Sequence, residues 1–137
     1  MSWTSVRSSR LALALAGLCL AIACSRPPVK RVGMVIGVKP DRIAAYKAVH
    51  AASNSGVRDL LSKYHMRNFS IYLQQLEDGA YYLFAYYDYD GSDYNGDMAK
   101  LSAEKRNIEW LSVTDAMQIP LRGQKSWTQM EEVYHNE

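Results

Sequence analysis

The 137-residue sequence predicts one α+β domain whose strands and helices follow the order β-α-β-β-α-β. Three observations predict this order. Four strand-like segments rich in β-branched residues and tyrosine occur at 29–38, 67–75, 80–89 and 127–135. Helix-like segments lie between the first and second strands and between the third and fourth strands. A Glu-Asp-Gly turn at 77–79 joins the two middle strands directly, as in a hairpin.

Residues 1–24 predict a bacterial lipoprotein signal peptide. Arg7 and Arg10 supply the positive start, and an apolar run covers 11–23. As a helix this run would reach about 20 Å, too short for the roughly 30 Å core of a bilayer. It ends in small residues before Cys24, which resembles a lipobox with Cys24 as the lipidated residue. Ordinary secretion with cleavage after Ala23 is the alternative.

The leader and a tether at 25–31 leave a domain at 32–137, expected in the cell envelope on a lipid anchor, or else secreted or periplasmic. Both cysteines, Cys19 and Cys24, belong to the leader, so the domain has no disulfide and no thiol nucleophile. Without Arg7 and Arg10 the chain has 14 basic and 14 acidic residues. A neutral domain without a basic stripe argues against a nucleic-acid partner.

The first strand, 29–38, ends at Lys39, where Pro40 and Asp41 start a helix. That helix carries Tyr46 and His50 four residues apart, a spacing that stacks both side chains on one face with Cβ atoms roughly 6 Å apart. A phenol beside an imidazole can transfer protons. A half-buried core pair has the same spacing, so the pair alone decides nothing.

The remaining elements follow turn signals. Residues 53–56 interrupt the first helix, and a second helical piece covers 57–64. The acidic segment 88–97 fails the spacing of a calcium loop and reads as a solvated turn. A long helix is expected over 94–112, with a connection at 113–126.

This order is that of a ferredoxin-like antiparallel sheet with helices on one face. The other face must also be covered, and packing of two sheets in a homodimer would cover it. No His, Asp or Glu cluster has metal-ligand spacing, so no metal is expected.

In the order and spacing of its short sequence segments, the chain resembles the L-rhamnose mutarotase family from about Val32 to His135. The segments that carry the resemblance are 38–41 (VKPD), 46–50 (YKAVH), 67–73 (RNFSIYL), 81–86 (YYLFAY), 97–100 (DMAK), 110–115 (WLSVTD), 118–121 (QIPL), and Trp127 with 130–135 (MEEVYH). The resemblance implies a dimeric ferredoxin-like α/β barrel that acts on a monosaccharide without a cofactor.

The resemblance also implies site residues. His50 would be the catalytic proton donor, and Tyr46 would bind sugar together with Phe69, Glu109 and Trp110. Three positions depart from the family pattern: Phe69 replaces a tyrosine, Glu109 replaces the first tryptophan of a pair, and 51–56 lacks a Trp-Pro pair. In this variant Glu109 is the expected complementary base.

Two alternatives stay open from the sequence. The departures fit a sugar-binding lipoprotein without catalysis. The same dimeric barrel also hosts haem- or quinone-handling monooxygenases, in which His50 would bind haem.

Overall fold

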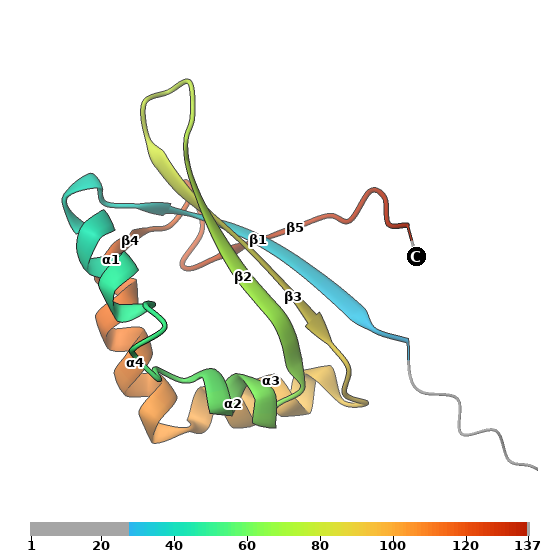
Figure 1. Cartoon of the computed structure of the whole chain (residues 1–137). Coiled ribbons are helices and arrows are strands. Elements are labelled where there is room, and N and C mark those ends of the chain that lie inside the picture. Colours follow the sequence, from blue (N-terminus) through green and yellow to red (C-terminus); the bar gives the residue numbers. More distant parts are fainter. Residues whose placement is uncertain (1–27, 137) are drawn as a thin grey trace, which may run out of the picture.

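The computed structural model describes residues 28–136 (Figure 1). The expected signal peptide with Cys24, and residues 25–27 of the expected tether, lie outside the described residues. The elements are β1 (Lys30–Val38), the 3-10 helix η1 (Pro40–Arg42), α1 (Ile43–Val49), α2 (Arg58–Lys63), β2 (Met66–Gln75), β3 (Tyr81–Tyr89), α3 (Tyr94–Ala103), α4 (Lys105–Asp115), β4 (Gln118–Ile119) and β5 (Thr128–Met130). Within this described part, no helix is long and apolar enough to cross a membrane.

The sheet has the order β2-β3-β1-β4, with β5 also paired to β1, and all pairs are antiparallel. β1 pairs with β3 along its whole length, from Lys30 opposite Tyr89 to Val38 opposite Tyr81. β4 and β5 lie in turn along the free edge of β1, so together they occupy the position of the fourth strand. The predicted ferredoxin-like order is confirmed.

The fourth strand is shorter than the predicted 127–135, because its ladder with β1 ends at Met130 opposite Gly33. Beyond that point an ion pair between Arg31 Nε and Glu132 Oε2, at 2.8 Å, keeps the tail near β1. The backbone at Ile119 can approach β1 closely because Gly37 lacks a Cβ, which would lie 2.8 Å from the Ile119 carbonyl oxygen.

The predicted helix 94–112 is two helices, and the second continues to Asp115. The break is at Glu104, whose backbone is extended (φ −65°, ψ 122°). Its carboxylate accepts hydrogen bonds from Tyr64 Oη at 2.6 Å and Lys63 Nζ at 2.5 Å, both at the end of α2. These tertiary contacts hold the bend that gives α4 its own direction (Figure 1).

All four α-helices lie on the same side of the curled sheet (Figure 1). Alternate residues of β3, at positions 83, 85, 87 and 89, are buried beneath them. One core cluster groups Val32 and Tyr87 with α2 and α3, and a second groups Ile36 and Leu83 with Tyr46 of α1. The space between the helices and the inner face of the sheet contains a large pocket.

Candidate functional site

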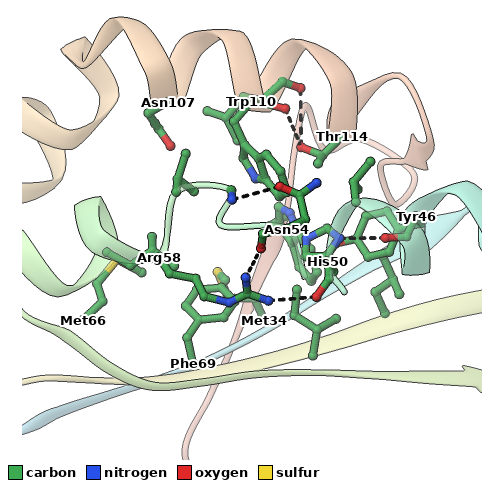
Figure 2. Close-up of a pocket in the computed structure, with 18 of the residues that line it drawn as sticks. Met34, Tyr46, His50, Asn54, Arg58, Met66, Phe69, Asn107, Trp110 and Thr114 are labelled. Carbon is green, nitrogen blue, oxygen red and sulfur yellow. Dashed lines mark hydrogen bonds between the residues drawn. The ribbon is translucent and has the colours of Figure 1, made fainter. Parts of the chain in front are cut away.

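A cavity of about 980 Å³ lies between α1, the segment that follows it, α4 and the inner face of β2 (Figure 2). This volume is at the upper end of the range for small-molecule sites. Its walls combine apolar side chains with a few polar groups, and its lining includes Tyr46, His50, Phe69 and Trp110. Four of the five sugar-site residues expected from the sequence therefore share one cavity.

His50 ends helix α1 and turns its ring back on that helix. Its Nδ1 lies 2.8 Å from the Tyr46 carbonyl oxygen, and because a carbonyl only accepts, Nδ1 carries the proton of this bond. In the neutral imidazole, Nε2 is then the nitrogen with a free lone pair.

Two aromatic rings confine the His50 imidazole. The Tyr46 ring stacks on it, with centroids 4.2 Å apart at 27°, and the Trp110 ring meets it edge-on, with centroids 5.1 Å apart at 75°. Burial lowers the pKa of His50; the bond to the Tyr46 carbonyl opposes this shift, and the Arg58 cation adds to it. Burial also raises the pKa of Tyr46 to about 12, so its phenol stays protonated near neutral pH.

Arg58, which sequence reasoning did not single out, holds the segment after α1 in place. Its guanidinium donates to the carbonyl oxygens of His50 at 2.9 Å, Ala51 at 3.1 Å and Asn54. A cation at a helix C-terminus satisfies carbonyls that the helix leaves unpaired. The available signal was an arginine in the first turn of α2, where the helix dipole disfavours positive charge.

Gly56 gives a structural reason for the unusual sequence at 51–56. Its φ is +51°, and a Cβ there would lie 3.1 Å from two carbons of the Trp110 ring. The Asn54 side-chain oxygen accepts a hydrogen bond from Gly56 N at 3.1 Å. The bare backbone of this segment therefore supports the ring of Trp110.

Phe69 lies on β2 where the ladder with β3 is irregular, between Arg67 and Ser70. Its ring stacks parallel to Tyr87, with centroids 5.4 Å apart at 3°. Phe69 thus forms part of the cavity floor and is held by the core.

Glu109 is not among the residues that line the cavity. Its side chain is 63% exposed on α4, and its carboxylate lies 3.8 Å from Lys105 Nζ, one turn earlier. Successive helix residues point about 100° apart, so Trp110 can face the cavity while Glu109 faces solvent.

Three buried polar residues also line the cavity and were not anticipated: Asn107, Thr114 and Gln118. Asn107, Trp110 and Thr114 are spaced i, i+3 and i+7, so they share one face of α4. That spacing was the available signal. Among residues 28–136, no group of three or more His, Cys, Asp or Glu side chains could hold a metal ion.

Comparison with protein families finds that the sequence model for L-rhamnose mutarotase matches residues 31–136. No match is found among curated proteins. Among solved structures, an L-rhamnose mutarotase from Formosa agariphila is similar, with a TM-score of 0.58 and 17% identity over 79% of this chain and 99% of its own. A "Putative antibiotic biosynthesis monooxygenase from Nitrosomonas europaea" has a TM-score of 0.49 and 15% identity over 77% and 91%.

The support that Gly56 gives to Trp110 can be measured by comparing Gly56→Ala with Gly79→Ala. Both positions have a positive φ, but a Cβ at Gly79 meets nothing within 4 Å. Both variants carry backbone strain of about 1 kcal/mol, and only Gly56→Ala should also displace Trp110. Urea unfolding and the NMR shift of the Trp110 indole N–H measure these effects. Equal destabilisation with an unmoved indole signal in both variants would contradict the contact.

Proposed function

The chain belongs to the L-rhamnose mutarotase family, and on that premise we propose that it interconverts the α and β anomers of L-rhamnose or a related 6-deoxy or other pyranose sugar. Family membership implies an isomerase-type activity on carbohydrate. The observation that carries the detailed proposal is the geometry of His50, whose Nδ1 is bonded to its own helix. Nε2 is the nitrogen left for a ligand in the cavity.

Mutarotation opens a pyranose at the anomeric carbon and closes it again on the other face. The neutral Nε2 of His50 takes the proton of the anomeric hydroxyl while the bond between the anomeric carbon and the ring oxygen breaks. The imidazolium then gives that proton to the ring oxygen, which leaves an open-chain aldehyde and a neutral histidine. Closure after rotation of the aldehyde reverses both transfers. One histidine can therefore serve as base and acid.

The lowered pKa of His50 supports this assignment, because the neutral base is the resting form near pH 7. Tyr46 holds the ring of His50 by stacking and, being protonated, can donate but not accept a proton in the reaction. Trp110 and Phe69 offer aromatic faces to the apolar side of a sugar ring. Glu109 has no role in this mechanism, since it does not line the cavity.

We also propose that the chain forms a homodimer through the outer face of its sheet. Tyr72, Phe84, Val35 and Thr128 are direct partners in a row across four strands, so their side chains share that face. Tyr72 is 65% exposed, and Thr128 Oγ1 is buried without a hydrogen-bond partner. A second sheet packed symmetrically on this row would remove its apolar side chains from water.

A lipid anchor at Cys24 in the cell envelope remains our proposal for location. Its support is the sequence of the leader: positive residues, a short apolar run and small residues before Cys24. The alternative is secretion after cleavage behind Ala23.

The catalytic proposal predicts that His50→Gln slows enzyme-dependent anomer exchange about 100-fold or more, the usual contribution of one acid–base group. Saturation-transfer NMR with L-rhamnose measures it, with His65→Gln and Glu109→Gln as controls that keep wild-type rates. Because the pKa of His50 is held below 6.5, the wild-type rate should be flat above about pH 6.5 and fall in more acid solution.

Three results would change the proposed function. Undiminished exchange in His50→Gln removes the histidine from the reaction. Sugar binding without exchange in the wild type identifies a sugar-binding protein. A haem Soret band on reconstitution, lost in His50→Gln, identifies the monooxygenase alternative.

The homodimer predicts that Phe84→Glu yields monomers in light scattering after gel filtration, because a charge at the centre of the apolar row cannot be desolvated cheaply. Val113→Glu is the matched control. It adds the same charge at a partly exposed valine on α4 and should leave the dimer intact. The opposite pattern would move the interface to α4.

The lipid anchor predicts that labelled palmitate is incorporated in bacteria expressing the full chain and that Cys24→Ser abolishes this incorporation. Cys19→Ser, which changes the leader's other cysteine, should retain the label. An unlabelled wild-type protein whose mass begins at Cys24 would show secretion instead.

A further inference from the structure

Asn107 on α4 lines the large cavity and has a side-chain amide that forms no hydrogen bond within the described chain. Only 6% of the residue is exposed. Its amide atoms are not among the fully buried polar atoms that lack a partner, so they face the cavity and are open to hydrogen bonds from a molecule there. Asn107 lines the large cavity, so a molecule in that cavity is the partner its amide can reach.

The position of Asn107 relates it to the proposed reaction centre. It lies one turn before Trp110 on the same face of α4, and the Trp110 ring contacts His50. In Figure 2 the Asn107 side chain points from α4 into the pocket, on the side of Trp110 away from Tyr46. A pyranose with its anomeric carbon at His50 and its ring against Trp110 therefore directs the hydroxyls of its far side toward Asn107.

The surroundings of Asn107 favour a neutral ligand. The cavity lining includes two arginines, and both are already paired: Arg58 with three carbonyls, and Arg67 with Asp90 at 3.3 Å and the Ser62 carbonyl at 2.7 Å. The third cation of the lining, Lys47, is an exposed residue of α1, whereas Asn107 lies on α4. A carboxamide has no charge and offers both donors and an acceptor, which suits two neighbouring hydroxyls.

The cavity near Trp110 is also apolar, since Met66 and Leu101 line it and belong to the buried cluster on which Trp110 packs. Water compensates poorly for a missing partner in such surroundings. A site built to bond a hydroxyl therefore rejects a ligand that lacks it much more strongly than an apolar pocket rejects a missing methylene.

We propose that Asn107 is the specificity-determining residue of the sugar site, whose carboxamide bonds two neighbouring hydroxyls on the side of a neutral pyranose away from the anomeric carbon. The inference rests on the proposed function and adds to it the hydroxyls that the enzyme recognises. On this proposal, the polar face of α4 that carries Asn107 selects the substrate.

The test compares L-rhamnose with its monodeoxy analogues, each lacking one ring hydroxyl. Wild-type exchange should be at least about 10-fold slower with the analogues that lack a hydroxyl bonded by Asn107. Asn107→Leu, which is similar in volume, should slow L-rhamnose to the rate of those analogues and leave the analogues themselves unchanged. Its Tm should not fall, because no hydrogen bond within the described chain is lost. Asn95→Leu, the same change at an exposed site on α3, is the control and keeps full discrimination.

Two results overturn the inference while the proposed function stands: equal slowing of every sugar in Asn107→Leu, or no change with any of them. A wild type that exchanges no sugar overturns the catalytic function instead. In that case NMR titration with L-rhamnose decides the inference separately. Shifted side-chain amide signals of Asn107 in wild type and in His50→Gln support recognition by Asn107, and unmoved signals overturn it.

Discussion

The hydrogen bond from His50 Nδ1 to the carbonyl oxygen of Tyr46, at 2.8 Å, is the constraint on which the site depends. It forms where helix α1 ends, and the same Tyr46 carbonyl also accepts a longer hydrogen bond, 3.3 Å, from the backbone N–H of His50. Because the ring turns back on its own helix, it stacks on Tyr46 and meets Trp110 with its edge. One local bond thereby sets the ring's orientation, its tautomer and its neighbours.

The rest of the fold keeps this arrangement in place. Arg58 pairs with the carbonyls that α1 exposes, which stabilises the abrupt end of that helix. Gly56 lets the backbone pass beneath the Trp110 ring. The bend at Glu104, held by the end of α2, directs α4 so that Trp110 reaches His50. Contacts from α2, from the segment before it and from α4 together hold the His50 imidazole in place.

Strand positions were predictable because all three long strands are rich in β-branched and aromatic residues, and β3 also alternates buried and partly buried residues along its length. The predicted bounds of these strands agree with the structure to within one residue at each end. The single helix expected at 94–112 was wrong for a different reason. Glutamate is a good helix former, so the sequence does not mark a break at Glu104. In the structure its carboxylate accepts hydrogen bonds from Lys63 and Tyr64 at the point where the backbone is extended.

The sequence alone determined the order of elements, the family resemblance and the Tyr46–His50 pair, because each depends on residue type and local spacing. Only the tertiary structure decided that Glu109 faces solvent, that Arg58 closes the end of α1, and that Asn107 turns an unpaired amide into the cavity. The positions of Glu109 and Asn107 depend on the direction of α4, which contacts between residues 40 and 41 apart hold, and the role of Arg58 depends on how the chain turns between α1 and α2. No local pattern encodes either.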